Sequence, residues 1–328
     1  MKVAQFEQFG SPEYVVEIVE RPDPPPPGAG QIQVAMKIMP INPADILLIE
    51  GRYGRQPQLP CTPGAEGVGE VEIVGPEVEG IEVGDLVVPL RGGLWRQRLT
   101  CRAANVIKIP AAGDIDQAAL LKINPATADI MLSDMATLAP GDWVMQNAAN
   151  STVGRFVTQF AAERGLRTAN IIRRRDMAKT LEAEGADLIL IDDGLNELLA
   201  ETFLKHNGGV GAKLGLDAVG GLSTNHLACC LARGATLVSY GMLSGRNCEI
   251  DPALLLYRDL KIRGFWLDDW FQQSTRGEID ASYGRINDLM AKGQIHGIIE
   301  SRFDLSNVKE ALAHTAETSR NGKVVLTV

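Results

Sequence analysis

From about residue 119 onward, segments typical of buried strands alternate with segments typical of helices, and this rhythm restricts the fold more than any other feature. DWVMQNA is followed by VGRFVTQFAAERG, RTANIIRR, MAKTLEAEGA and LILID, and the alternation returns in AKLGLDAVGG, HLACCLARG and ATLVSYGM. Strands that are separated by helices pair in parallel, and the connecting helices cover both faces of the sheet. The sequence therefore predicts an α/β fold with a parallel sheet.

Residues 1 to about 110 have a different pattern, in which short alternating runs are separated by Gly and Pro. The runs QIQVAMKIM (31–39), GVGEVEIVG (67–75) and DLVVPL (85–90) have the period of two that is typical of half-buried strands. They predict a compact, antiparallel, barrel-like domain. The proline run RPDPPPPGAG (21–30) is interpreted as a stiff connector between two strands rather than as a ligand of a proline-binding module.

Charge and cysteine content limit the partners and the compartment. The net charge is −9, which disfavours non-specific binding to nucleic acid or to an anionic membrane, and no apolar run approaches a membrane span. The five cysteines are odd in number and irregularly spaced, which favours a reducing compartment over a disulfide framework. Because MKVAQFEQFG lacks the apolar core of a signal peptide, a cytoplasmic location is expected.

The first strand–helix junction of the alternating part, VMQNAANSTVGRF (144–156), is a candidate nucleotide-binding turn. In a Rossmann unit this turn approaches a pyrophosphate, and the positive end of the following helix faces the same group. Of the usual G-x-G-x-x-G pattern only Gly154 is present, and Asn150, Ser151 and Thr152 take the other places. The motif alone is weak, so a plain strand–helix turn remains an alternative.

Three consecutive arginines, Arg173, Arg174 and Arg175, follow the second strand of the alternating part. A site for NAD has an acidic residue near this place, which accepts a hydrogen bond from the ribose 2′-hydroxyl. A solvated basic loop is the alternative interpretation. However, the next helix is expected to begin near Asp176, and its positive end should repel three arginines. The cluster therefore favours the 2′-phosphate of NADPH, which a guanidinium can bind through two hydrogen bonds.

With these features in place, the chain resembles the medium-chain dehydrogenase/reductases, and within them the enoyl thioester reductases of the mitochondrial fatty acid synthesis type. The similar stretches are INPADILLIEGRYG (41–54), LKINPATADIML (121–132), QNAANSTVG (146–154), LDAVGG (216–221), YGM (240–242) and RGFWLDDW (263–270). The resemblance implies a GroES-like, β-rich catalytic domain at 1–118, completed by 266–328, and a Rossmann NADP-binding domain at 119–265. It also implies a homodimer that reduces a 2-enoyl thioester of coenzyme A or of a carrier protein with NADPH.

The resemblance also places the functional residues. The catalytic tyrosine of the family falls on Tyr53. The cofactor contacts fall on Asn124, Ser151, Thr152, Val153, Gly154, Arg173, Arg174, Arg175, Tyr240, Gly241, Met242, Leu243, Phe265, Trp266, Leu267 and Lys323. This chain departs from the family pattern twice: Thr152 stands where a glycine is usual and can crowd the pyrophosphate, and Arg174 stands where an acid is common and should sharpen the preference for NADPH.

The stretch GAEGVG argues against a zinc site. Zinc-dependent members have a GHE motif that supplies a histidine ligand, and here Ala65 occupies that place. The NPAD segment supplies no cysteine, and Cys229 and Cys230 are adjacent on a predicted helix, so their thiols point apart. We therefore expect a metal-free enzyme.

A metal-free site can still reduce an activated C=C bond. Hydride from NADPH is expected at C3 of the enoyl thioester, and the charge that develops on the C1 oxygen then needs a hydrogen-bond donor. Tyr53 is expected to be this donor and to supply the proton, although water is an alternative proton source. A quinone oxidoreductase or a reductase of small enones and haloacrylates fits the same features, and an NADPH-binding sensor is the non-enzymatic alternative.

Other polar residues receive structural interpretations. Asn42, Pro43 and Asp45 are predicted to be the cap, the first residue and the third residue of a helix, and Glu66 is predicted to accept from backbone donors in a turn. The segment RGGLWRQRLTCR (91–102) has four arginines and no acid, and its Arg96, Arg98 and Arg102 are expected to share one face of a strand. That face is interpreted either as solvated or as a docking patch for an acidic carrier protein or the phosphates of coenzyme A.

Overall fold

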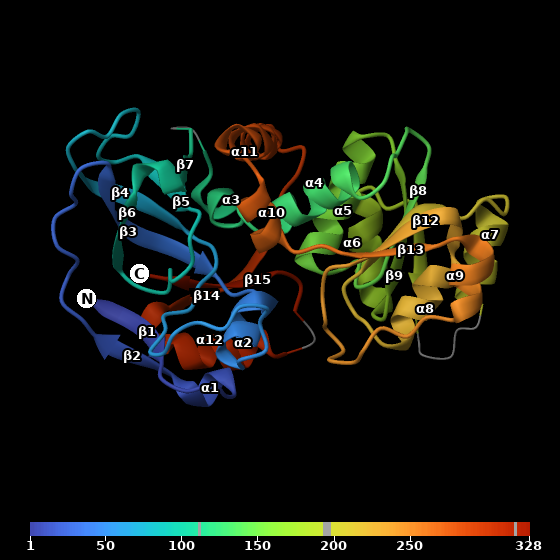
Figure 1. Cartoon of the computed structure of the whole chain (residues 1–328), viewed down its shortest axis with the longest axis horizontal. Coiled ribbons are helices and arrows are strands. Elements are labelled where there is room, and N and C mark those ends of the chain that lie inside the picture. The colour runs from blue at the N-terminus through green and yellow to red at the C-terminus, as the bar shows by residue number, and fades with distance from the viewer. Residues whose placement is uncertain (111–112, 193–197, 318–319) are drawn as a thin grey trace. The chain divides into compact units, whose positions relative to one another are not determined.

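The computed structural model describes residues 1–110, 113–192, 198–317 and 320–328. It divides into two compact units (Figure 1), the first formed by Met1–Ile123 together with Gly277–Val328 and the second by Asn124–Arg276. The first unit is therefore built from both ends of the chain, and the second is inserted between them.

The second unit contains a six-stranded sheet in the order β10-β9-β8-β11-β12-β13, in which every pair of neighbours is parallel. Its strands are β8 (Trp143–Gln146), β9 (Arg167–Ile172), β10 (Leu188–Ile191), β11 (Ala212–Asp217), β12 (Leu231–Ser239) and β13 (Lys261–Gly264). The strand order reverses at β8, which lies between β9 and β11. In sheets of this kind, ligands bind outside the carboxyl ends of the strands at the point of reversal.

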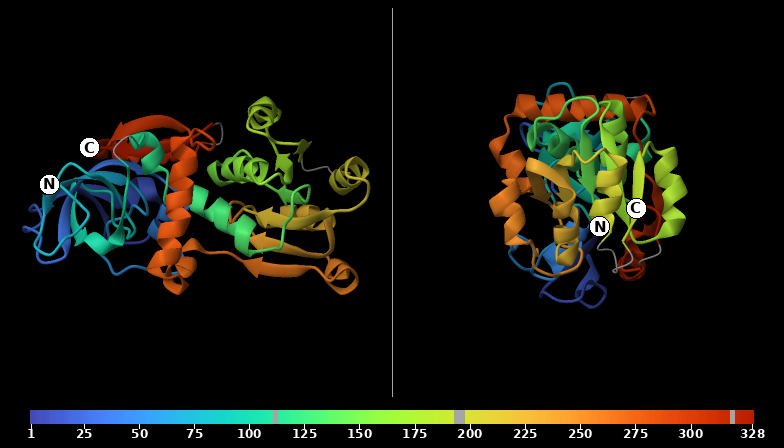
Figure 2. Two further views of the ribbon diagram at one scale, coloured as in Figure 1. Left: turned by 90° about the horizontal axis from the view of Figure 1, so that it is seen from above. Right: turned by 90° about the vertical axis from the view of Figure 1, so that its right-hand side faces the viewer.

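Helices lie on both faces of this sheet (Figure 2), as the alternating pattern predicts. The helices of the second unit are α4 (Asn124–Asp134), α5 (Thr152–Glu163), α6 (Ala178–Ala183), α7 (Leu199–His206), α8 (Leu222–Cys229), α9 (Pro252–Arg258) and α10 (Leu267–Gln273), with the 3-10 turn η2 (Arg175–Met177) before α6. Trp143 and Met145 of the central strand pack with Phe203, Leu227 and Leu237 in a common apolar core. The predicted α/β fold is confirmed.

The first unit contains a seven-stranded sheet in the order β14-β15-β3-β4-β5-β7, with β6 paired to β3, and a separate pair β1-β2. The strands are β1 (Lys2–Phe6), β2 (Val16–Glu20), β3 (Gln31–Pro40), β4 (Val68–Val74), β5 (Leu86–Pro89), β6 (Arg98–Arg102), β7 (Val106–Lys108), β14 (Ile299–Asp304) and β15 (Lys323–Thr327). All pairs are antiparallel except β14-β15. The carboxyl-terminal strand completes the sheet because Leu326 pairs with Met39 of β3.

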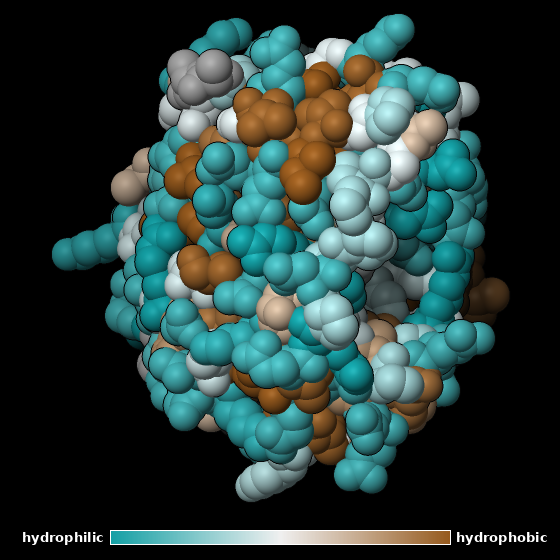
Figure 3. All heavy atoms as spheres, turned by 90° about the vertical axis from the view of Figure 1, so that its left-hand side faces the viewer, coloured by the Kyte–Doolittle hydropathy of each residue, from teal (hydrophilic) through white to brown (hydrophobic). Residues whose placement is uncertain are grey.

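The helices of the first unit are short, apart from α11. They are α1 (Pro12–Val15), α2 (Pro43–Ile49), α3 (Ile115–Ala119), α11 (Arg276–Ala291) and α12 (Val308–Thr315), with 3-10 turns η1 (Ala103–Asn105) and η3 (Leu305–Asn307). Phe6, Met36, Trp95 and Leu326 are fully or almost fully buried in one core. On the face in Figure 3, hydrophobic side chains gather only in small groups among hydrophilic ones. Nowhere in the described part of the chain does a helix combine the length and the hydrophobicity that crossing a membrane requires.

Candidate nucleotide-binding and catalytic site

The turn from β8 to α5 lies at the carboxyl end of the central strand of the second unit. Ser151 is the N-cap of α5, and its side chain accepts a hydrogen bond from the Gly154 amide at 3.2 Å. A Cβ atom added at Gly154 would come within 2.6 Å of the Ala149 carbonyl oxygen, which is closer than real Cβ atoms approach. Gly154 therefore lets the first turn of the helix pack directly on the loop, which is the role of the last glycine of a dinucleotide-binding turn.

Buried polar side chains fix this turn from below. The Gln146 amide donates to the Gly154 carbonyl at 2.9 Å and to Asn170 Oδ1 at 2.7 Å, and the Thr158 hydroxyl donates to the same carbonyl at 3.2 Å. All three side chains are buried. These side chains are shielded from water, so moving the turn would leave their polar groups without hydrogen-bond partners. The free-energy cost of that loss holds the turn in one conformation.

The end of β11 contributes a second buried polar group, at the LDAVGG stretch. Asp217 Oδ1 accepts from the Asn147 amide at 2.6 Å and from the Val219 and Gly220 backbone amides at 2.9 and 3.0 Å. Its other oxygen accepts from the Thr224 hydroxyl at 2.6 Å. Neither Asn147 nor Asp217 is among the site residues predicted from the sequence, although both lie in the stretches that carry the family resemblance. Their positions directly at strand ends are the signal that identifies them.

Tyr240 and Gly241, which follow β12, lie against Asp217 and Ala218 at the end of β11. A Cβ atom at Gly241 would come within 2.7 Å of the Ala218 carbonyl oxygen, so only glycine fits here without a shift. Burial raises the pKa of Tyr240, as does the neighbouring Asp217 carboxylate, whereas the Ser151 side chain acts in the opposite direction. The structure thus brings together Ser151, Asp217 and Tyr240, whereas Met242 and Leu243 are about half exposed.

The arginine cluster follows the end of β9 at Ile172. Arg174 forms an ion pair with Asp176 at 2.5 Å, which lowers the pKa of that carboxyl. Arg173 and Arg175 are exposed, and neither forms an ion pair with any residue that the structure describes. Two of the three guanidinium groups therefore remain available for an anion.

The remaining predicted cofactor residues of the second unit lie at element boundaries. Phe265 follows β13, and its backbone amide donates to the Ser239 carbonyl at 3.0 Å. Trp266 is the N-cap of α10, which begins at Leu267, and Asn124 is the buried first residue of α4. Together with Arg173 and Tyr240, the residues after β13 lie at carboxyl ends of parallel strands, and these ends form one edge of the sheet.

These features meet the requirements of NADPH. The loop before α5 is narrow because of Gly154, and the unpaired amides of the first turn of this 12-residue helix can bind a pyrophosphate. Arg173 and Arg175 provide cationic donors at the end of the neighbouring strand, as a 2′-phosphate requires.

Tyr53 belongs to the first unit, in the loop after α2. The helix begins as predicted, with Asn42 as N-cap, Pro43 in the first turn and Asp45 closing a capping box through a 2.8 Å bond from the Asn42 amide. The backbone amides of Arg52 and Tyr53 both donate to the Leu47 carbonyl, at 2.8 and 3.0 Å. These backbone bonds tie the position of Tyr53 to the last turn of α2. The Tyr53 side chain is half-buried.

A buried polar cluster surrounds Ala65 in the same unit. Asp45 Oδ1 accepts from the backbone amides of Gly64 at 3.2 Å and Ala65 at 2.8 Å. Glu66 accepts from the Asn42 side-chain amide at 2.8 Å and from the Ile123 backbone amide at 2.9 Å, which confirms the prediction that it pairs with a backbone donor.

Lys323, the first residue of β15, also lies in this cluster. Its ammonium group is buried and donates to the Asn42 side-chain oxygen and to the Ile41 carbonyl oxygen, the latter at 3.4 Å. Burial raises the pKa of Asp45 to about 6, raises that of Glu66 and lowers that of Lys323 to about 8. The Glu66 and Asp45 carboxylates act against the lowering of the Lys323 pKa, so the three groups influence one another's protonation in a low-dielectric interior.

Where zinc-dependent dehydrogenases present a histidine, this chain thus presents the methyl group of Ala65, next to two buried carboxyl groups that share Lys323 as a charge partner. Over residues 1–110, 113–192, 198–317 and 320–328, no group of three or more His, Cys, Asp or Glu side chains is arranged to hold a metal ion. The prediction of a zinc-free enzyme stays a prediction.

Comparison with known proteins places the chain in a family. Residues 28–111 match the alcohol dehydrogenase GroES-like domain, and residues 184–326 match a family described as zinc-binding dehydrogenase. The human mitochondrial enoyl-[acyl-carrier-protein] reductase is 36% identical over 303 residues, which cover 90% of this chain and 81% of the relative. The chain belongs to the medium-chain dehydrogenase/reductase superfamily. It is an oxidoreductase, and relatives that match it at 36% identity are enoyl reductases, as the sequence resemblance indicated.

Solved structures agree with this placement. The Etr1p complex with NADP and crotonyl-CoA superposes with a TM-score of 0.90 at 25% identity, covering 100% of this chain and 99% of that one. Escherichia coli quinone oxidoreductase complexed with NADPH superposes with a TM-score of 0.89 at 25% identity and covers 100% of both chains. The fold therefore fits both an enoyl reductase and a quinone reductase.

The names of the relatives correct one expectation. The enoyl reductases from Homo sapiens, Bos taurus and Dictyostelium discoideum are all mitochondrial, so the expected cytoplasmic location is wrong. Free cysteines indicate a reducing environment, but they do not distinguish one reducing compartment from another.

Proposed function

We propose that this medium-chain reductase uses NADPH to reduce the C2=C3 bond of a trans-2-enoyl thioester. The observation that carries the proposal is the 36% identity, over 90% of the chain, to an enoyl-[acyl-carrier-protein] reductase. The structure of a more distant relative with NADP and crotonyl-CoA supports a thioester substrate. The acyl carrier is coenzyme A or a carrier protein.

The second unit supplies the cofactor site in this proposal. The amides of Thr152 and Val153 and the Ser151 hydroxyl face the pyrophosphate at the start of α5, and Gly154 allows its close approach. Arg173 and Arg175 bind the 2′-phosphate, while Arg174 stays paired with Asp176. When bound, NADPH supplies the hydride that C3 of the substrate receives. Tyr240 and Gly241 close the site beside the pyrophosphate turn.

The first unit supplies the donor to the substrate. The Tyr53 hydroxyl hydrogen-bonds to the thioester oxygen, where negative charge accumulates as hydride reaches C3. A phenol with a pKa near 10 is protonated at pH 7, so it can stabilise the enolate and then deliver a proton. The loop that carries Tyr53 is anchored through α2, which Asp45 fastens to the 64–65 turn by two hydrogen bonds.

Quinone reduction is the competing function, because two quinone reductase structures superpose on this chain with TM-scores of 0.92 and 0.89, against 0.90 for the enoyl thioester reductase. Steady-state NADPH oxidation with crotonyl-CoA, a longer enoyl-CoA and a simple quinone separates the two. We expect the enoyl-CoA substrates to be reduced with a higher kcat/KM than the quinone. Reduction of the quinone with no turnover of either enoyl-CoA would refute the proposal. If NADPH binds and no acceptor is reduced, the chain is a sensor instead.

The family resemblance further implies a homodimer. Light scattering of the purified chain tests this directly, and a monomeric mass at micromolar concentration would contradict it.

A further inference from the structure

A cavity of about 850 Å³ opens on the first unit beside strand β6, and arginines dominate the charged groups around it. Arg91, Arg96 and Arg102 line it, and none of its lining residues, all of which the structure describes, is acidic. The whole chain has a net charge of −9, so this concentration of positive charge is opposite to the general balance. A cavity lined by charges of one sign attracts and concentrates ligands of the opposite charge.

Two polar atoms in this lining are buried and have no hydrogen-bond partner among the described residues, Arg96 Nε and Thr100 Oγ1. The Arg96 guanidinium also forms no ion pair within that part of the chain, and it lies close to Gly93, where a Cβ atom would be 3.3 Å from Nη2. Arginine cannot give up its charge in a protein. Arg96 is only half-buried, but its buried Nε–H lacks an acceptor, and an anion in the cavity would offer acceptor oxygens to this guanidinium.

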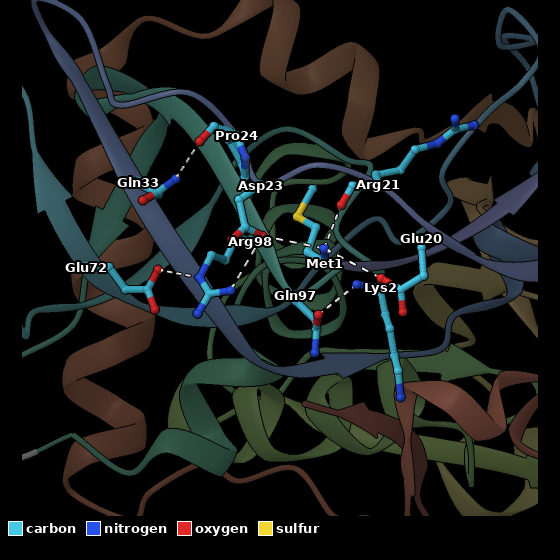
Figure 4. Close-up of polar contacts among 10 residues, drawn as sticks. All are labelled: Met1, Lys2, Glu20, Arg21, Asp23, Pro24, Gln33, Glu72, Gln97 and Arg98. Carbon is cyan, nitrogen blue, oxygen red and sulfur yellow. Dashed lines mark hydrogen bonds and ion pairs between the residues drawn. The ribbon is translucent and has the colours of Figure 1, made fainter.

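The neighbouring Arg98, in contrast, is paired with acidic side chains of the protein (Figure 4). Its Nε donates to Glu72 at 2.8 Å, and its Nη1 lies 3.7 Å from Asp23. Strand β6 begins at Arg98, so Arg96 precedes the strand, and the expectation that Arg96 shares a strand face with Arg98 and Arg102 is wrong. The charge of Arg98 is neutralised within the protein, whereas that of Arg96 is not.

We propose that this cavity is a binding site for a phosphate-type oxyanion. Arg96 and Thr100 donate to the anion, since a guanidinium and a hydroxyl match phosphate oxygens. Gly92 and Gly93 leave room for the ligand beside the guanidinium. The exposed Arg91 and Arg102, which have no ion pair within the described ranges, add attraction at the rim. The phosphate is either free or part of a nucleotide phosphomonoester, and the site does not depend on the proposed reductase activity.

Isothermal titration calorimetry of the full chain, with inorganic phosphate and with adenosine 3′,5′-bisphosphate, tests the proposal. We compare wild type with Arg96→Gln, Thr100→Val and the matched control Arg98→Gln. Losing a charge-assisted hydrogen bond should weaken binding of both probes by about 10-fold or more in Arg96→Gln. Binding to Arg98→Gln should remain within about twofold of wild type, because that guanidinium is already paired.

Comparing the two probes distinguishes the two phosphate sources, and a second variant controls for misfolding of Arg96→Gln. Tighter binding of the bisphosphate assigns the site to a nucleotide phosphomonoester, and equal binding assigns it to free phosphate. Should Arg96→Gln prove unstable by thermal unfolding, the exposed double variant Arg91→Gln/Arg102→Gln takes its place, and its binding should weaken at least several-fold at low salt. The proposal is overturned if millimolar phosphate does not bind wild type, if Arg98→Gln weakens binding as much as Arg96→Gln, or if only an acidic protein binds there.

Discussion

Replacing Arg173 and Arg175 together by alanine should remove most of the preference for NADPH over NADH. Both side chains are exposed and without an ion pair in the described part of the chain, so their charges are free to meet a 2′-phosphate. A hydrogen bond to a charged group contributes about 1.5 to 3 kcal/mol, and exposure places these two near the lower limit. Two such contacts amount to about 3 kcal/mol, or roughly 10²-fold in affinity.

The assay is the apparent KM for NADPH and for NADH, with the enoyl-CoA substrate saturating. The KM for NADPH should rise by about 10²-fold, and the KM for NADH should change little. Arg174→Ala/Asp176→Ala is the matched control, because it removes an ion pair with no net charge from the same loop. Its NADPH preference should stay near that of wild type. Equal use of the two cofactors by the wild-type enzyme, or a larger loss in the control than in the double arginine variant, would refute this reasoning.

Further predictions address the other parts of the site. Tyr53→Phe should lower kcat on crotonyl-CoA by about 10²-fold and leave the NADPH affinity nearly unchanged, whereas intact turnover would remove Tyr53 from catalysis. Gly154→Ala should weaken NADPH binding, since its Cβ would meet the Ala149 carbonyl at 2.6 Å, and unchanged binding by calorimetry would show that the loop moves freely. The lowered pKa of Lys323, about 8 against 10.5 when unfolded, means that the unfolded chain binds more protons between these values. The wild-type free energy of unfolding should therefore rise from pH 8 to pH 10.5 by an amount on the order of 3 kcal/mol relative to that of Lys323→Met. Urea titrations of both proteins measure this difference. A parallel pH dependence of the two proteins would contradict the burial of this charge. Elemental analysis should find no stoichiometric zinc, and one zinc per chain that is lost together with activity would show that Ala65 does not exclude the metal.

Much of the candidate cofactor site follows from local sequence rules. The turn at residues 144–156 was predicted because a strand, a small-residue loop and a helix follow one another, and these are short-range features. The capping box at Asn42 and Asp45 was predictable for the same reason. In contrast, the ion pair of Arg174 with Asp176 depends on the 3-10 turn after β9, which delays the helix start from the expected Asp176 to Ala178.

The chain's periodicity alone determined the division into a β-rich part and an alternating strand–helix part, because apolar spacing reports which face of each element is buried. Tertiary structure decided the rest, by bringing together residues that are far apart in sequence. Lys323, which the family resemblance assigns to the cofactor, reaches the Asn42 side chain 281 positions away because β15 pairs with β3. Arg96 and Arg98, two residues apart, differ only in what the fold places beside them: Glu72 and Asp23 neutralise Arg98, and an open cavity faces Arg96. Sequence spacing identifies a charged side chain, but its partners decide whether the charge is structural or available to a ligand.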